Sequence, residues 1–600
     1  MNGTAASAAA STNDLGPLPE WDLSDLYPSP DCPQLENDLQ AADQAAQALQ
    51  QRCRGNLAAI SGDMLGEAIA DYERLTETLY RVLSYAQLRY SADVSDPERG
   101  RFYQGIQERV TAISTQTLFF SLELNRLDDA TLAEKLASPK VAHYRSWLRD
   151  LRVFRDHQLS DEMEQVLHER EVVGRCAWVR LFDETMAEMR FPVNGKALTS
   201  AETLHLMSDK SAGNRKAAAV AFGRGLAEKS RLFTLITNTL IKEKEIDDKW
   251  RRYPRPTSYR NLSNQVEDHV VDALAQAVHG AYSQLSHRYY GMKARWLGVE
   301  QLDYWDRNAP LPEDEDRRIP WQEAREIVIG AYGAFSPQLA EVGRRFFEND
   351  WIDAPARPGK SPGAFAHPTV PSAHPYLLLN YLGKTRDVMT LAHELGHGVH
   401  QVLAAGKGQL MADTPLTLAE TASVFGETLT FRALLDAEKA PARRRIMLAA
   451  KVEDMLNTVV RQIAFYEFER AIHVERRRGE LSAERIGEIW LDIQRESLGP
   501  SLRFHDEYGH YWSYIPHFIH TPFYVYAYAF GDCLVNSLYD VYRAGAPGFE
   551  QNYIDMLKAG GTLRHKDLLA PFGLDAGDPA FWRRGLDVIV GFIDELEEMS

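Results

Sequence analysis

The sequence predicts a mainly α-helical protein with a small β-sheet beside one helix, and three observations support this fold class. Apolar residues recur at three- and four-residue intervals along most of the chain. The one long interruption, residues 355–375, is rich in Pro and Gly and precedes an apolar run typical of a short strand. With 600 residues and 44% hydrophobic content, the chain is long enough to form more than one lobe.

Along the chain we expect three regions. Residues 1–19 are small and polar, without a basic start or an apolar core, which predicts a disordered tail and not a signal peptide. Residues 20–200 form an N-terminal helical region, and residues 201–600 form a second region that contains the motif discussed below. A long helix is predicted after Ser61, with an apolar stripe at Leu65, Ile69, Tyr72, Leu79, Val82 and Ala86.

Composition excludes several functional classes. The net charge of −18 argues against a nucleic-acid partner, because such binding depends on clustered Lys and Arg. No apolar run reaches the length of a membrane span, so no membrane partner is expected. The four cysteines are scattered and form no C-x-x-C pair, which favours a reducing cytoplasm: Cys32, Cys53, Cys176 and Cys533.

The motif His393-Glu-Leu-Gly-His397 is the strongest chemical signal. The preceding run contains no Gly or Pro, offers Thr385 as an N-cap, and predicts a helix. Two imidazoles four residues apart then share one face and can bind a single zinc ion, while Glu394 lies where a general base belongs. The buried stripe of this helix is expected at Val388, Leu391, Ala392 and Leu395. The pattern predicts metal-assisted hydrolysis of an amide.

A hydrolytic zinc ion usually takes three protein ligands, so a third one is needed. Residues 416–429 read as a second helix in which Glu420 and Glu427 lie seven positions apart, on one face. Spacing alone leaves open which glutamate binds the metal. The other is expected to hold a coordinating histidine in place.

The segment before the motif offers a surface for a peptide. Gly359 and Gly363 let the loop approach another backbone. The run Pro375–Tyr381 is predicted to be an edge strand beside the metal-binding helix. An extended peptide that pairs with such an edge is held through its backbone, whatever its side chains.

These residues carry a family resemblance. The motif extended to His400, followed by Leu418-Ala-Glu420-Thr-Ala-Ser-Val-Phe-Gly-Glu427, resembles the thimet oligopeptidase and oligoendopeptidase F family of zinc endopeptidases. Other segments resemble the oligoendopeptidase F branch, from residue 20 to beyond residue 520. They are Glu20–Tyr27, Leu302–Asp306 with Ala309–Leu311, Arg357–Phe365, Ile515–Phe518 and Pro522–Tyr528.

The resemblance implies a more detailed site. Glu420 would be the third ligand of one Zn²⁺ ion, and Glu427 would orient a ligand. Gly363 and Ala364 would contact substrate. It also implies two helical lobes around a deep channel with zinc at its floor, which short unfolded peptides enter and folded proteins do not.

Near the C-terminus the resemblance implies groups that stabilise the oxyanion of the tetrahedral intermediate. The family has a Tyr-Tyr-x-Tyr segment and a nearby histidine, whereas this chain reads Phe523-Tyr-Val-Tyr526. We therefore expect Tyr526 to stabilise the oxyanion, Tyr524 to contact substrate, and His517 to assist. The family's histidine has variable spacing, so His520 or His510 could serve instead of His517.

The function expected from sequence is a zinc-dependent metalloendopeptidase that cuts short oligopeptides internally, with Glu394 as general base. One alternative is carboxypeptidase or dipeptidyl carboxypeptidase action, which needs a basic residue placed to hold a terminal carboxylate. A second alternative is a non-catalytic peptide-binding protein; the complete set of His393, Glu394, His397 and Glu420 argues against it.

Overall fold

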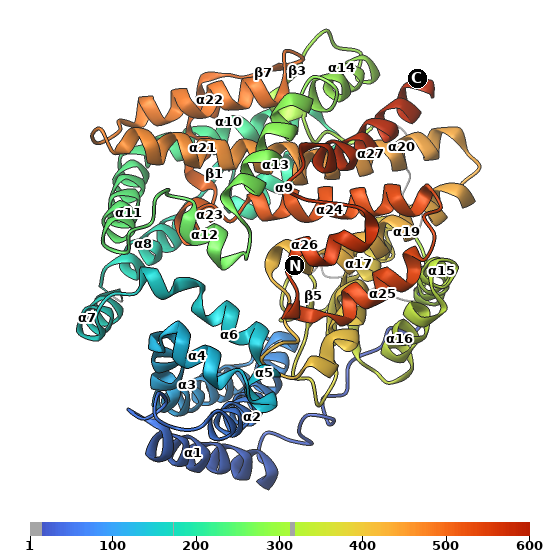
Figure 1. The fold of residues 1–600 in the computed structure, drawn as a ribbon. Coiled ribbons are helices and arrows are strands. Elements are labelled where there is room, and N and C mark those ends of the chain that lie inside the picture. The colour runs from blue at the N-terminus through green and yellow to red at the C-terminus, as the bar shows by residue number, and fades with distance from the viewer. Residues whose placement is uncertain (1–14, 172, 312–317, 600) are drawn as a thin grey trace, which may run out of the picture. The chain divides into compact units, whose positions relative to one another are not determined.

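The protein is represented by a computed structural model that describes residues 15–171, 173–311 and 318–599. The chain forms two compact units, each built from separate stretches of sequence. The first unit comprises Met1–Arg155, Asp316–Ala437 and Gly545–Gly573, and the second comprises Asp156–Glu315, Glu438–Ala544 and Leu574–Ser600. Helices dominate both units, with a few small sheets (Figure 1), which confirms the mainly α prediction.

In the first unit the described helices are α1 (Pro33–Cys53), α2 (Gly62–Ala92), α3 (Pro97–Arg126), α4 (Asp129–Lys135), α5 (Pro139–Ala142), α6 (Arg145–Leu151), α15 (Trp321–Phe335), α16 (Pro337–Glu348), α17 (Thr385–Ala404), α18 (Leu416–Ala419), α19 (Thr421–Ala437), α25 (Phe549–Lys558) and α26 (His565–Leu569). Its strands are β4 (Ile352–Pro355), β5 (Phe365–His367) and β6 (Tyr376–Tyr381). Short 3-10 turns occur at Ala405–Lys407, Gly560–Thr562 and Ala570–Phe572, and another, Arg152–His157, links the units in sequence.

In the second unit the described helices are α7 (Asp161–Glu171), α8 (Arg175–Glu188), α9 (Ser200–Leu206), α10 (Ala212–Glu228), α11 (Ser230–Trp250), α12 (Ser258–Ser263), α13 (Asp268–Ala281), α14 (Ser286–Trp296), α20 (Pro441–Thr458), α21 (Val460–Arg476), α22 (Ala483–Leu498), α23 (His517–His520), α24 (Tyr526–Arg543) and α27 (Pro579–Glu598). Its strands are β1 (Phe191–Val193), β2 (Lys196–Leu198), β3 (Leu302–Asp303) and β7 (Leu502–Arg503), with 3-10 turns at Tyr304–Asp306 and Asp506–Tyr514.

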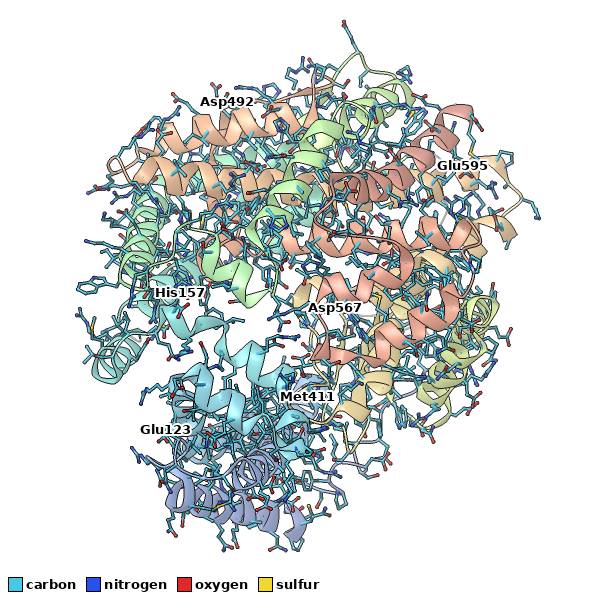
Figure 2. The ribbon with its side chains drawn as sticks, in the orientation of Figure 1. Glu123, His157, Met411, Asp492, Asp567 and Glu595 are labelled. Atoms are coloured by element: carbon cyan, nitrogen blue, oxygen red, sulfur yellow. The ribbon has the colours of Figure 1, made fainter. Side chains whose placement is uncertain are left out.

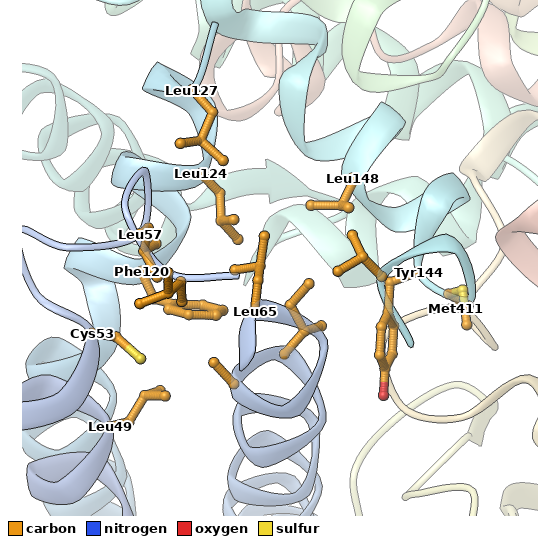
Figure 3. Close-up of a cluster of buried hydrophobic side chains, with 14 residues drawn as sticks. Leu49, Cys53, Leu57, Leu65, Phe120, Leu124, Leu127, Tyr144, Leu148 and Met411 are labelled. Atoms are coloured by element: carbon orange, nitrogen blue, oxygen red, sulfur yellow. The ribbon is translucent and has the colours of Figure 1, made fainter. Parts of the chain in front are cut away.

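Helices α1, α2 and α3 lie side by side and enclose an apolar core (Figure 1). Helix α2 begins after Ser61, whose hydroxyl accepts the N–H of Met64 at 3.3 Å, as the sequence predicts. Figure 3 shows the core, to which Met411 contributes from the segment after α17; the same side chain is labelled in Figure 2. Burial of these side chains ties the segment between α17 and α18 to the N-terminal helices.

The sheet of the first unit has the strand order β4-β6-β5. Strand β6 pairs in parallel with β4 and antiparallel with β5, and α17 contacts β5 and β6. The predicted sheet beside the motif helix is therefore present. The prediction that residues 375–381 form an edge strand is wrong, because β6 is the central strand. Its almost uninterrupted burial explains why its sequence is apolar throughout and does not alternate.

Two further predictions need revision. Residues 1–14 of the predicted tail lie outside the described residues, but residues 15–19 pack against the first unit: Leu15 is buried, its carbonyl accepts the N–H of Trp321, and the carbonyl of Pro19 accepts the N–H of Ala354. A hydrogen-bonded backbone of this kind is not a disordered tail. The boundary predicted near residue 200 also differs from the observed units, since the first 155 residues pack with segments from the middle and end of the chain.

Among the described residues, no helix is both long and apolar enough to cross a membrane. Residues 191–198 form a short hairpin, in which β1 and β2 pair antiparallel around Asn194 and Gly195. Both turn residues have positive φ, as an Asn-Gly turn requires.

A buried carboxyl group marks the interior of the second unit. Glu469 of α21 is 1% exposed, and its Oε1 accepts the N–H of Phe523 at 2.9 Å. Oε2 has no hydrogen-bond partner among the described residues. Burial raises the pKa of Glu469 to about 8, against the opposing effects of the Phe523 N–H and of Arg260 and Lys244.

This burial predicts a pH-dependent stability. The neutral carboxyl contributes stability that is full below its ordinary pKa of 4.5 and is lost as pH rises toward about 8. Glu469→Gln keeps an acceptor but never ionises. Its free energy of unfolding should therefore rise relative to wild type between about pH 5 and pH 8, by up to about 1.4 kcal/mol per pH unit. Urea unfolding at several pH values measures this, with Glu228→Gln on an exposed residue as control. Parallel pH curves for wild type and Glu469→Gln would refute the prediction.

Candidate metal centre

Helix α17 places His393 and His397 on one face, with 4.9 Å between the ring centroids. The expected apolar stripe lies on the buried side, and Val388, Leu391, Ala392 and Leu395 have no measurable exposure. Both histidines are half-buried, with 27% and 20% of their side chains exposed. The helix therefore presents two imidazoles to an accessible site while its other face anchors it in the first unit.

The start of α17 differs from the prediction. Thr385 is the first helical residue and not the N-cap. Asp387 supplies the cap instead, because its Oδ2 accepts the N–H groups of Leu382 and Lys384 at 2.9 and 3.0 Å. A carboxylate in the first turn also suits the positive end of the helix dipole.

Helix α17 packs on α19 with backbone in direct contact, and Gly396 makes this possible. A Cβ atom at Gly396 would lie 2.5 Å from the carbonyl oxygen of Ala422 and 2.6 Å from the Cα of Ser423. Gly398 has a different neighbour: its Cβ would lie 2.6 Å from the ring of Phe346 on α16. Both glycines therefore serve close packing within the unit.

The third candidate ligand, Glu420, lies at a break between α18 and α19. The sequence predicts one helix through this point, but Glu420 terminates the short α18 and α19 begins one residue later. The hydroxyl of Ser423 donates to Glu420 Oε2 at 2.7 Å and fixes the carboxylate. Glu420 Oε2 lies 3.4 Å from His393 Nε2 and 3.5 Å from His397 Nε2.

This donor set fits one metal ion. Within the described residues, His393, His397 and Glu420 are the group of His, Cys, Asp or Glu side chains whose ligand atoms converge, all within 4.8 Å of one another. Donors bound to one tetrahedral zinc at about 2.1 Å lie about 3.4 Å apart, which matches the two measured separations. Two imidazoles and one carboxylate also leave a position open, as catalytic zinc sites do.

Each histidine has a partner besides Glu420. Glu427 Oε2 lies 3.3 Å from His393 Nδ1, on the side of the ring away from Glu420. The backbone carbonyl of Ala419 raises the pKa of His397 against the larger effect of burial. Such partners orient the ring and make the metal-facing nitrogen more basic.

The carboxylates around the two histidines act differently on their pKa values. Burial lowers the pKa of His393, but the hydrogen bond to Glu427 and the charges of Glu420 and Glu394 outweigh it and raise the pKa to about 9. Burial lowers the pKa of His397 to about 4. Since a ligand must be deprotonated to bind, metal and proton compete for His393.

Glu394 lies between the two histidines in sequence and is 8% exposed. Burial raises its pKa to about 7 and Glu420 adds to the rise, while His393 opposes it. The backbone N–H of Ala366 on β5 also lowers the pKa of Glu394. A buried carboxylate with a pKa near neutrality suits proton transfer, and a cation beside it would lower that pKa.

Comparison with known proteins agrees with this geometry. The family model described as peptidase family M3 matches residues 205–588, and the model described as oligopeptidase F matches residues 123–191. The chain belongs to peptidase family M3. Within it, the relatives below place the chain in the oligoendopeptidase F branch and make it a metallo-oligopeptidase.

The similarity extends over nearly the whole chain. Oligopeptidase PepF of Bacillus subtilis is 26% identical over 96% of this chain and 87% of its own length. An oligoendopeptidase F homologue of Lactococcus lactis is 24% identical over 98% and 99%. A solved structure from Chlamydophila abortus superposes with a TM-score of 0.85 at 23% identity, covering 97% of this chain and 98% of that one. Oligoendopeptidase F from Enterococcus faecium gives a TM-score of 0.70 at 22% identity, over 94% and 97%.

In this M3 peptidase the predicted substrate residues Gly363 and Ala364 precede the edge strand β5. Gly363 is exposed and has a φ of +83°, which turns the chain into β5. Among the strands that the structure describes, β5 pairs with β6 alone, so its other edge carries no strand. Helix α17 contacts β5, so this edge lies beside the helix that bears Glu394.

The predicted C-terminal residues lie in the second unit. His517 and Tyr524 are half-buried, and their rings stack with centroids 5.9 Å apart. Tyr528 completes the group, with its hydroxyl 3.3 Å from His517 Nε2. His520 is separate and bonds Asp183 at 2.8 Å.

Tyr526 does not fit the role expected for it. Its side chain has no measurable exposure, its ring packs on Tyr466, and its hydroxyl accepts the side-chain N–H of Asn264 at 2.9 Å. A buried hydroxyl cannot donate to a substrate in this conformation. Tyr526 is buried at the start of α24, whereas Tyr524 and Tyr528, four residues apart, are both half-buried and lie beside His517.

Sequence reasoning also missed Tyr332, Ala366 and Ser423. The hydroxyl of Tyr332 donates to the carbonyl of Ala392 at 2.7 Å, directly before His393. No sequence signal identifies Tyr332 and Ala366, because both are distant in sequence from the motif and Ala366 acts through its backbone. Ser423 lies three residues after Glu420, and this local spacing could have identified it.

The close helix contact predicts the effect of one methyl group. Gly396→Ala should separate α17 from α19, at a cost of about 1 to 3 kcal/mol, and lower metal affinity by roughly tenfold or more. Zinc affinity is measured by chelator competition. Gly406→Ala is the matched control, because nothing lies within 4 Å of its added Cβ. Equal affinities for the two variants would contradict the importance of this contact.

Proposed function

We propose that this M3 peptidase is a zinc-dependent endopeptidase that hydrolyses internal peptide bonds of short oligopeptides. The observation that carries the proposal is the convergence of His393, His397 and Glu420 with Glu394 beside them. Three donors with one open position, next to a buried carboxylate, are what metal-assisted amide hydrolysis needs.

The donor set favours zinc, although two imidazoles and a carboxylate also accept manganese or cobalt. Bound at this position, the ion would polarise the scissile carbonyl and acidify water. Glu427 beside His393 and the Ala419 carbonyl beside His397 would orient the two imidazoles toward the metal ion.

Glu394 acts as general base and then as general acid. It accepts a proton from the attacking water and delivers it to the departing amine. The Ala366 N–H fixes the direction of this carboxylate, and its burial keeps water from competing for the proton.

The substrate backbone pairs with the outer edge of β5. Gly363 and Ala364, which precede this strand, have small side chains or none, so a peptide can come close to their backbone. Backbone pairing suits an enzyme that cuts peptides of varied sequence. By family resemblance, Tyr524 and His517 contact the substrate, and Tyr528, which is bonded to His517, joins this group.

Two variants test the division between metal binding and catalysis. Glu394→Gln should retain zinc and lose activity by about 10²- to 10⁴-fold, because the amide cannot take a proton. His393→Ala should lose both. Hydrolysis of a quenched fluorescent peptide and zinc content are measured on each sample. Substantial activity in zinc-loaded Glu394→Gln would remove Glu394 as the base.

The position of cleavage is tested with the same peptide blocked at both ends. Wild type should cut the blocked peptide internally, because β5 binds backbone and not termini. Mass spectrometry of the products identifies the bond. If cleavage requires a free C-terminus, the enzyme is a carboxypeptidase or dipeptidyl carboxypeptidase instead.

A further inference from the structure

The loop between β4 and β5 is tied to the sheet by an asparagine that the proposed mechanism does not use. Asn380, half-buried on β6, donates from Nδ2 to the carbonyl of Gly363 at 2.8 Å and to that of Ser361 at 3.1 Å. A side-chain amide has two N–H hydrogens, and these two carbonyls use both.

This tether holds the point where the chain enters β5. Gly363 turns with positive φ, and β5 pairs with β6 over only three residues, from Phe365 opposite Leu378 to His367 opposite Tyr376. So short a strand has little pairing of its own to fix its position. Asn380 lies on β6, the strand with which β5 pairs. Strand β6 therefore holds both the loop, through the Asn380 side chain, and β5, through backbone pairing.

The position of β5 matters to the proposed base. Strand β5 contacts α17, the helix that bears Glu394, and the backbone N–H of Ala366 at the middle of β5 lowers the pKa of this carboxyl group. A shift of β5 therefore changes the surroundings of Glu394 and moves the edge to which the substrate backbone would pair. Displacements of about 1 Å in such groups can cost about 10²-fold in rate.

The start of the loop is anchored independently. Lys360 is buried, and its ammonium donates to Asp353 Oδ1 at 2.7 Å and to the carbonyls of Asp353 and Pro355, both at 2.9 Å, and of Leu379 at 2.5 Å. These bonds hold the loop to β4 and β6. A change at Asn380 would therefore act locally, on residues 361–366, with the sheet intact.

We propose that Asn380 is a positioning residue that sets β5 against Glu394 and the substrate backbone. The proposal rests on the proposed function, in which Glu394 is the general base. Asn380 touches neither the candidate ligands nor Glu394 in any contact described above, so its effect would reach the reaction only through β5.

The test uses the full-length, zinc-loaded protein. Asn380→Asp keeps the size of the side chain, removes both donors and turns a carboxylate toward two carbonyl oxygens. We expect backbone hydrogen exchange of residues 363–366 to rise at least tenfold and kcat for an internally quenched peptide to fall at least tenfold. Zinc content should not change, because the candidate ligands lie on α17 and at the break between α18 and α19.

Two other variants make the result specific. Asn380→Gln keeps an amide donor on a longer arm and should lie closer to wild type than Asn380→Asp in both exchange and kcat. Asn349→Asp removes the same kind of bond, from Asn349 Nδ2 to the carbonyl of Arg345 at 2.8 Å, at the exposed end of α16. It should leave kcat and the exchange of residues 363–366 unchanged.

Three outcomes would overturn the proposal. Unchanged exchange in Asn380→Asp would mean that Asn380 is no tether. Raised exchange with unchanged kcat would mean that the tether does not position the base. Absence of hydrolysis in zinc-loaded wild type would defeat the proposed function itself and with it the positioning role, while the exchange measurement would still report on the tether alone.

Discussion

The candidate centre depends on the direct contact between α17 and α19. Two candidate ligands lie on α17 and the third lies directly before α19. The two helices approach closely because Gly396 has no side chain where Ala422 and Ser423 pass. On the same side, Tyr332 from α15 reaches the carbonyl of Ala392. The ligand geometry is thus set by packing of a few small residues, since backbone atoms in contact have no freedom to adjust.

Around this contact the structure arranges opposite charges in pairs. Glu420 lies between the two Nε2 atoms, and Glu427 lies behind His393. Three carboxylates gathered around two imidazoles in a partly buried site favour a compensating positive charge. A proton on His393 or a divalent cation could supply this charge, and the separations between the ligand atoms fit a cation.

The three-stranded sheet connects substrate recognition to the proposed base. Its central strand β6 is buried and holds β4 and β5, while Lys360 and Asn380 tie the intervening loop at both ends. Strand β5 contacts α17, and its edge away from β6 is the one that the proposed function gives to an extended peptide. The position of this short strand depends on polar side chains, because its pairing with β6 covers only three residues.

The sequence by itself determined the helical character, the His393–His397 pair with Glu394, and the two candidate partners Glu420 and Glu427, because helical periodicity places residues four or seven apart on one face. It also located the small sheet next to α17. Family resemblance selected Glu420 over Glu427, a choice that spacing left open. The order of the strands, the packing of residues 15–19, the break at Glu420 and the burial of Tyr526 came only with the tertiary structure. Each of these four features depends on backbone hydrogen bonds and close packing with segments that are distant in sequence. A local pattern of residue types does not determine which distant segments become neighbours.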